Sequence, residues 1–184
     1  RPLWDFPDGT LCNREVAAWV VAEQLGFGFV PPTVLRDGPH GEGSVQQFIH
    51  ADLHEHYLTI SHDFDDVFRA VCLFDLVINN ADRKSGHCML ETGTGRIWVI
   101  DHGVSFHAQP KLRTVIWDFA GEPVPAERLE AVRAFAARID EVSALRSLLA
   151  AQEIDAMRVR AEQIVKEGVF PEPGPGRPFP WPPV

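Results

Sequence analysis

Two aspartates on either side of a predicted β-hairpin are the residues of this sequence best suited to chemistry. Asp82 opens the run Asp-Arg-Lys-Ser-Gly-His, which places the cation of Lys84 and the imidazole of His87 close behind it. Asp101 follows the apolar run Ile-Trp-Val-Ile and precedes a His-Gly pair. Because the outer ends of two paired strands lie next to each other, we expect Asp82 and Asp101 to be neighbours in space.

This set of groups suits phosphoryl transfer. One carboxylate can orient an attacking hydroxyl, the other can hold a divalent cation across the phosphates, and a nearby lysine can neutralise charge on the transferred group. Each motif alone is more typical of a surface ion pair or of a strand end. Their combination with the hairpin and with a buried helix before it favours a functional site.

The elements that must position these groups follow from the spacing of apolar residues. The helix over 65–79 is apolar on nearly every side, which predicts a buried helix, and Asn79 and Asn80 at its end could cap it or brace the following loop. The Pro-rich run 169–184 can form neither helix nor central strand, so we expect it to pack loosely. The other expected helices cover 11–25, 126–139, 143–149 and 153–166. The expected strands cover 33–35, 45–49, 88–90 and 96–100.

Composition excludes several classes of protein. The chain has 26 acidic against 17 basic residues and a formal net charge of -9, which disfavours nucleic-acid partners and anionic bilayers. No apolar run approaches the roughly 18 residues that span a membrane, so we expect no integral membrane association. Cys12, Cys72 and Cys88 form no Cys-X-X-Cys pair and are odd in number, which favours the reducing cytoplasm.

The runs F-D-L-V-I-N-N-A-D-R-K-S-G-H-C-M-L and G-R-I-W-V-I-D-H-G-V-S-F resemble the catalytic and metal-binding loops of the phosphatidylinositol 3- and 4-kinase-like kinases. The runs R-P-L-W-D-F-P-D-G-T-L and R-E-V-A-A-W-V-V narrow the resemblance to a small actinobacterial branch. The resemblance implies an α+β fold of the atypical protein-kinase-like, two-lobe type. An incomplete N-lobe would cover 1–49 and a mostly helical C-lobe 50–168, with the Pro-rich tail over 169–184.

The resemblance also implies a role for each candidate residue. Asp82 would orient the acceptor hydroxyl and Lys84 would contact the γ-phosphate, while His87 and Asp101 would hold Mg or Mn. His87 stands where most kinases have asparagine, which puts the choice between these metals in question. Glu15 would pair with a lysine on the α- and β-phosphates. The hinge against which adenine packs would consist of Gln46, Gln47, Phe48 and Ile49.

The implied activity is therefore transfer of the γ-phosphoryl group of ATP, with a divalent metal, to a hydroxyl acceptor. The partners would be the nucleotide and a protein, small molecule or inositol lipid that carries this hydroxyl. The sequence departs from the family pattern because no lysine precedes Lys84, and Arg1 is the only cation near the strand expected to carry one. We expect that the sequence begins inside a longer protein, and the alternative is a nucleotide-binding pseudokinase or scaffold.

A third interpretation is a metal-dependent phosphohydrolase that uses histidine and aspartate ligands. His50, His54 and His56 include a spacing of four residues, which on a helix can bind zinc. The run Leu-Thr-Ile that follows at 58–60 is a poor continuation of such a helix. A polar, histidine-rich linker between two lobes explains the same pattern without a metal.

Overall fold

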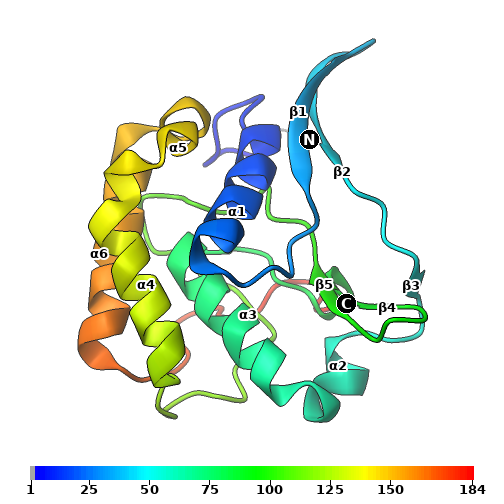
Figure 1. The fold of residues 1–184 in the computed structure, drawn as a ribbon, viewed down its shortest axis with the longest axis vertical. Coiled ribbons are helices and arrows are strands. Elements are labelled where there is room, and N and C mark those ends of the chain that lie inside the picture. Colours follow the sequence, from blue (N-terminus) through cyan, green and yellow to red (C-terminus); the bar gives the residue numbers. More distant parts are fainter. Residues whose placement is uncertain (1–2) are drawn as a thin grey trace.

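The computed structural model describes residues 3–184, so the expectation concerning Arg1 lies outside the described residues. This part of the chain forms an α+β domain, as predicted (Figure 1). Its helices are α1 (Leu11–Leu25), α2 (Tyr57–Ile60), α3 (Asp65–Ile78), α4 (Ala126–Arg138), α5 (Ser143–Leu148) and α6 (Ala151–Glu167), with short 3-10 helices at Ser61–Asp63, Ser85–His87 and Ile139–Glu141. Its strands are β1 (Thr33–Gly38), β2 (Gly41–Gln46), β3 (Ala51–Asp52), β4 (Cys88–Glu91) and β5 (Ile97–Val99).

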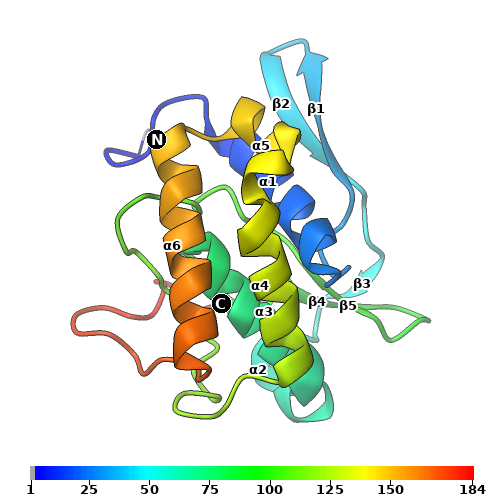
Figure 2. The ribbon, with the colours of Figure 1, turned by 60° about the vertical axis from the view of Figure 1, so that its left-hand side comes forward.

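Helix α3 lies at the centre of the domain, as its nearly continuous apolar surface predicts. Phe68, Leu73 and Phe74 are fully buried in it. Helices α4 and α6 pack side by side and cover one flank of the core (Figure 2). The helix ends at Asn79, whose φ of 55° is left-handed and turns the chain into the polar loop that carries Asp82.

The strands form two small antiparallel sheets. In the first, β1 pairs with β2, and this hairpin projects away from the helices on the side of α1 opposite α4 and α6 (Figure 1). The second has the order β3-β4-β5, with Cys88 opposite Val99. The β4–β5 hairpin was predicted, and it joins the loop that contains Asp82 to the loop that begins at Asp101.

The strand predicted over 45–49 is wrong at both ends, because β2 runs from Gly41 to Gln46. Thr33, the first residue of β1, pairs with Gln46, the last residue of β2. Pro32 therefore stands where the next residue of the ladder would be. Proline has no N–H to donate, and the ladder therefore stops there. The N–H of Gln47 donates to the carbonyl of Pro32 at 2.9 Å, and the chain continues without strand structure until β3.

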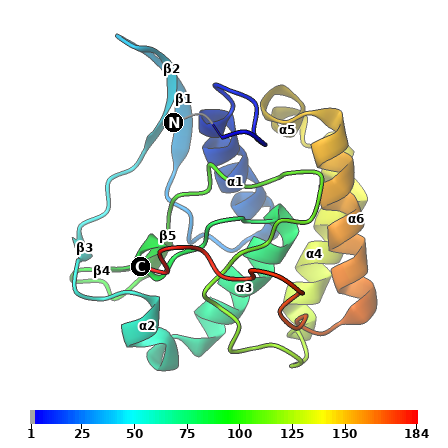
Figure 3. The ribbon, with the colours of Figure 1, turned by 180° about the vertical axis from the view of Figure 1, so that it is seen from behind.

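The Pro-rich end packs loosely in its side chains, as expected, with only Pro180 buried over 171–184, but backbone hydrogen bonds tie it to the domain. It crosses the domain from the end of α6 to a C-terminus that lies beside β5 (Figure 3). The carbonyls of Phe170, Pro178 and Pro183 accept hydrogen bonds from the N–H groups of Gly121, Thr114 and Ser85 at 2.9, 3.0 and 2.9 Å. Separately, none of the helices over residues 3–184 combines the length and the apolar character that a bilayer crossing requires.

Candidate active site

The two loops that carry the candidate aspartates run side by side. The N–H of Ala81 donates to the carbonyl of Val104 at 2.9 Å, and the N–H of Ile100 donates to the carbonyl of His87 at 3.0 Å. These bonds involve the residues directly before Asp82 and Asp101, so the backbone fixes both carboxylates on adjacent loops. We call the segment 79–87 the catalytic loop and the segment 100–106 the metal loop.

A buried ion pair fixes the catalytic loop to helix α3. The Arg83 guanidinium donates to both carboxylate oxygens of Asp75, at 2.9 and 3.0 Å, and both side chains are fully buried. Its third bond, at 2.8 Å, goes to the carbonyl of Ile100 in the metal loop. Burial acts to lower the pKa of Arg83, but the charge and hydrogen bonds of Asp75 outweigh it and the pKa is raised. Arg83 therefore stays charged and ties three segments together.

Asn79 and Asn80 both cap α3 and brace the loops. The Asn80 side chain donates to Asp75 at 3.0 Å and accepts the N–H of Asp82 at 3.0 Å. Asn79 ends the helix in its left-handed conformation, and its amide group donates to the carbonyl of His107 at 2.8 Å. The two roles considered for these asparagines, capping the helix and bracing the following loop, are thus both present.

The candidate metal ligands face each other. The Nε2 atom of His87 lies 3.2 Å from Oδ2 of Asp101. Burial, then the Arg83 charge, lower the pKa of His87 to about 4, so its imidazole is neutral at pH 7. Asp101 has a φ of 60°, an uncommon conformation for a residue with a side chain, and its carboxylate is about half exposed.

The Asp101 carboxylate fits a hard divalent cation as a partial ligand, whereas the His87 imidazole suits softer metals better. Magnesium is commonly held by one or two carboxylates together with substrate phosphates and water. Residues 3–184 contain no group of three or more His, Cys, Asp or Glu side chains arranged to share a metal. His50, His54 and His56 accordingly form no such cluster. The long 3.4 Å bond from the Lys84 N–H to Nδ1 of His87 puts the ring proton on Nε2, so metal binding there requires this proton to move.

Lys84 lies next to the carboxylate expected to orient the acceptor. Its Nζ is 3.3 Å from Oδ2 of Asp82, and both side chains keep contact with solvent. The cation that the sequence assigned to charge neutralisation is therefore placed beside Asp82 and three residues before His87. The pairs Asp82–Lys84 and His87–Asp101 thus lie on two adjoining loops, which carry the types of group that phosphoryl transfer needs. We call these four residues the candidate cluster.

Glu15 reaches the metal loop from helix α1. Its Oε1 accepts the N–H groups of His102 and Gly103 at 2.8 and 2.7 Å. Burial acts to raise the pKa of Glu15, but the bonds from His102 and Gly103 outweigh it and the pKa is lowered. A Cβ on Gly103 would lie 3.3 Å from this oxygen, so glycine permits the close approach. Among residues 3–184 the contacts of Glu15 are with His102 and Gly103 and none is with a lysine, so the pairing that the resemblance implies stays a prediction.

His102 is buried beside these contacts and stays neutral. It is fully buried, and burial lowers its pKa. Its ring packs edge-on against Phe74 of α3, with 5.6 Å between the ring centres. His102 therefore serves as a packing residue of the core, and it anchors the metal loop to α3.

The residues expected to form the hinge diverge in the structure. Gln46 ends β2 and donates from its side chain to the Thr33 hydroxyl at 2.8 Å. Phe48 is 77% exposed and packs only edge-on against His50, whereas Ile49 is buried. Gln47 lies between them without strand structure. The structure thus pairs Asp82 with Lys84 and His87 with Asp101, and the four hinge residues differ from one another in exposure and backbone structure.

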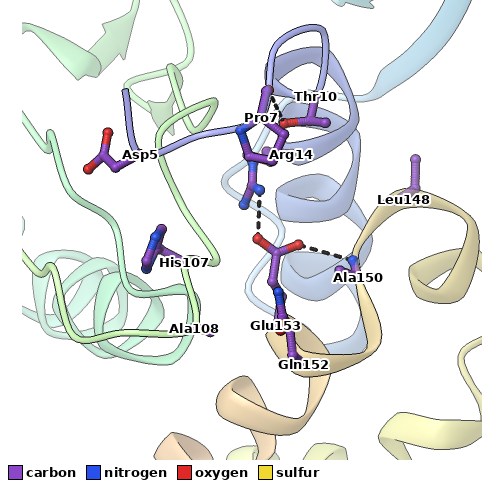
Figure 4. A pocket seen from close by; sticks show the side chains of 10 residues that line it. All are labelled: Asp5, Pro7, Thr10, Arg14, His107, Ala108, Leu148, Ala150, Gln152 and Glu153. Carbon is purple, nitrogen blue, oxygen red and sulfur yellow. Dashed lines mark hydrogen bonds and ion pairs between the residues drawn. The ribbon is translucent and has the colours of Figure 1, made fainter. Parts of the chain in front are cut away.

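A cavity of about 250 Å³ lies elsewhere, between the first turn of α1 and the start of α6 (Figure 4). Arg14 projects into it and pairs with Glu153 at 2.6 Å, with Asp5 and His107 on the far wall. None of the residues that line it belongs to the candidate cluster. This cavity is therefore separate from the loops described above.

Sequence reasoning missed Asp75 and Arg83, although one signal was available. Asp75 interrupts the apolar run Phe-Asp-Leu-Val-Ile on a helix that is buried on all sides. A buried carboxylate needs a cationic or hydrogen-bonding partner. The arginine that follows eight residues later, past the end of the helix, is the partner that the structure supplies.

Comparison with known proteins relates this chain to a family and to proteins of similar sequence or structure. Residues 36–160 match the family described as phosphatidylinositol 3- and 4-kinase. Protein Rv2133c of Mycobacterium tuberculosis is 38% identical to this chain over 219 aligned positions, which cover 99% of this chain and 78% of that protein. The crystal structure of the Helicobacter pylori proinflammatory kinase CtkA superposes with a TM-score of 0.56 at 13% identity, over 89% of this chain and 82% of CtkA. The two-lobe, atypical-kinase-like fold is thereby confirmed.

Proposed function

Because this chain belongs to the phosphatidylinositol 3- and 4-kinase family, we propose that it transfers the γ-phosphoryl group of ATP to a hydroxyl acceptor with the help of Mg or Mn. The observation that carries the proposal is the cluster of Asp82, Lys84, His87 and Asp101 on two loops joined by backbone hydrogen bonds. The mycobacterial relative agrees with the actinobacterial branch that the sequence resembles.

Each residue of the cluster has a part in this reaction. The Asp82 carboxylate accepts a hydrogen bond from the acceptor hydroxyl and aims its oxygen at the γ-phosphorus. The Asp101 carboxylate and the neutral imidazole of His87 would hold the metal, which supplies charge neutralisation across the phosphates when bound. Lys84 offsets negative charge beside Asp82. The Arg83–Asp75 pair keeps the spacing of the two loops fixed.

Glu15 takes a different part from the one expected. Its carboxylate holds the N–H groups of the two residues after Asp101, and so fixes the backbone from which the Asp101 side chain projects. A phosphate contact from a lysine paired with Glu15 forms no part of this proposal. The same bonds suit a second candidate function equally, a pseudokinase that binds nucleotide without turnover. Such a protein would retain the Asp101 site and lack efficient transfer.

The partners of this reaction are the nucleotide and a molecule that carries the accepting hydroxyl. Protein, small-molecule and inositol-lipid acceptors all meet this requirement. We also propose a cytoplasmic location, since Cys12, Cys72 and Cys88 are free thiols and Cys72 and Cys88 are buried in the core. The acidic surface argues against nucleic acid as a partner.

A thermal-melt series tests the proposal and separates the alternatives. The full chain is melted with ATP, with Mg or Mn, and with both, since a ligand at about 100 times its Kd adds about 2.7 kcal/mol. A shift that requires both, together with phosphotransfer, supports a kinase. The same shift without phosphotransfer to any acceptor class supports the pseudokinase, and a shift with metal alone supports the phosphohydrolase.

Two isosteric variants assign the roles within the cluster. Asp101→Asn should remove the metal-dependent part of the nucleotide shift and leave the unliganded melting temperature nearly unchanged. Asp82→Asn should keep the shift and lower turnover by about two to four orders of magnitude, the range for loss of a positioned acid–base group. Asp63→Asn, an exposed aspartate with no bonded partner, is the matched control. Full turnover in Asp82→Asn contradicts the assignment.

A further inference from the structure

The Pro-rich tail over 169–184 is bound through backbone carbonyls to the region of the catalytic loop. The carbonyl of Pro178 accepts the N–H of Thr114 at 3.0 Å and the indole N–H of Trp117 at 3.3 Å. The carbonyl of Pro183 accepts the N–H of Ser85 at 2.9 Å, and Ser85 lies in the catalytic loop between Lys84 and His87.

Two of these donors, Thr114 and Trp117, lie on an extended segment that is itself tied to the catalytic loop. The N–H of Arg83 donates to the carbonyl of Arg113 at 3.0 Å, and the N–H of Val115 donates to the carbonyl of Arg83 at 3.1 Å. Arg83 and Thr114 thus form a parallel bridge. The tail therefore contacts segment 113–117 through Pro178 and the catalytic loop itself through Pro183, at Ser85, three residues along the chain from Asp82.

Side chains contribute little to holding the tail in place. Over 171–184 only Pro180 is buried, while Phe179 and Trp181 are 48% and 75% exposed. Each of the three hydrogen bonds replaces a bond to water, so its net contribution to stability is small. A segment held this way can leave without disturbing the core, and its prolines keep it extended at a low entropic cost.

We propose that the N–H groups of Ser85 and Thr114 and the indole of Trp117 form a docking surface for an extended polypeptide, which the chain's own tail occupies. Donors of this kind recognise a row of backbone carbonyls regardless of side chains, and aromatic surfaces dock proline-rich segments. Lipids and small acceptors offer no such row. The acceptor of the proposed phosphotransfer is then a polypeptide, which reaches Asp82 by displacing the tail. This part rests on the proposed function.

A cleavable chain tests the docking surface without requiring a truncated protein to fold. A protease site is inserted between Gly174 and Pro175, which are both exposed, and the folded protein is cut and washed free of the released peptide. Amide exchange at Ser85 and Thr114 should rise by about tenfold or more. A synthetic peptide with the sequence of 175–184 should restore protection in the cut protein and have no effect on the uncut one. The mirror-image peptide of D-residues is the matched control.

Two results overturn the docking surface. One is unchanged exchange at Ser85 and Thr114 after cutting and washing. The other is equal protection by the natural and mirror-image peptides. Trp117→Phe provides an independent variant, because it keeps the aromatic surface and removes the indole donor. It should weaken binding of the 175–184 peptide by about threefold to tenfold, as expected for one neutral hydrogen bond.

Phosphotransfer assays test the part that concerns the acceptor. With unfolded casein as a polypeptide acceptor, the rate should rise severalfold on cutting and fall again as the 175–184 peptide is added. The thermal shift with ATP and metal should stay the same throughout. Phosphorylation of phosphatidylinositol vesicles but not of casein overturns the acceptor assignment, as does a lower casein rate after cutting. Absence of the ATP-and-metal shift in the uncut chain contradicts the proposed function instead, and the exchange result still decides the docking surface.

Discussion

Removing one partner of the buried Asp75–Arg83 pair should destabilise the protein more than any surface charge change. Asp75→Asn keeps the shape of the side chain and removes the charge that compensates the fully buried guanidinium of Arg83. Breaking a buried ion pair in this way costs about 3 to 5 kcal/mol. Since domains of ordinary stability unfold with about 5 to 15 kcal/mol, this variant should lose a large part of its free energy of unfolding.

Urea denaturation measures this loss, and helix α3 supplies its own control. Asp65 on the same helix pairs with Arg69 at 2.8 Å, but its side chain is 58% exposed. Asp65→Asn should therefore cost no more than about 1 kcal/mol. An equal and small loss in both variants refutes the reasoning that Asp75 compensates a buried charge. If the slope of the unfolding free energy against urea concentration stays the same, the variant has lost stability without a change in the surface exposed on unfolding.

A double variant separates the charge effect from the packing effect. Asp75→Leu with Arg83→Met removes both charges and fills similar space, and such replacements are often neutral or stabilising. The double variant should therefore be more stable than Asp75→Asn. It should nevertheless transfer phosphate slowly, because the guanidinium bond to the Ile100 carbonyl, which spaces the two loops, is lost.

Three further predictions concern residues that belong to the metal loop or contact it. Glu15→Gln should lower the free energy of unfolding by about 1 to 2 kcal/mol, since it weakens charge-assisted bonds to two N–H groups. It should also reduce the thermal shift produced by ATP and metal together. An unchanged shift contradicts the role given to Glu15. Gly103→Ala should lower the melting temperature by a few degrees, because the added Cβ lies 3.3 Å from Glu15 Oε1, and differential scanning calorimetry measures this. Folded His87 has a pKa lowered to about 4, so the unfolded chain binds the proton first and the free energy of unfolding should fall between pH 6.5 and 4. Denaturation across this window should show a shallower fall in His87→Gln, with the remaining part due to buried His102.

The sequence predicted those parts of the structure that depend on neighbouring residues. The apolar surface of 65–79 and the polar run after it are local signals, and both α3 and the catalytic loop appear where they were expected. The end of β2 depended on register, because only the pairing of Thr33 with Gln46 puts Pro32 opposite Gln47. Hydrophobic pattern alone does not contain that information.

The candidate site was predicted in its members but not in its supports. Asp82, Lys84, His87 and Asp101 were selected by type and spacing, and the structure places them in two pairs on adjoining loops. The tail contacts were unpredictable for a physical reason. They use backbone carbonyls of proline residues, and every residue carries a carbonyl, so no side-chain pattern marks the ones that bind.

The contacts of Glu15 bear on both candidate functions, the kinase and the pseudokinase. A carboxylate that already accepts two N–H bonds from the metal loop stabilises that loop before any nucleotide arrives. The Asp101 site is then preformed whether or not a lysine reaches Glu15, because its backbone is held from α1 and its spacing from Asp82 is held by Arg83. Nucleotide binding and phosphate transfer therefore depend on different residues of this chain. A protein with an intact metal loop can bind nucleotide whether or not it transfers phosphate, so the rate of transfer, rather than binding, distinguishes a kinase from a pseudokinase here.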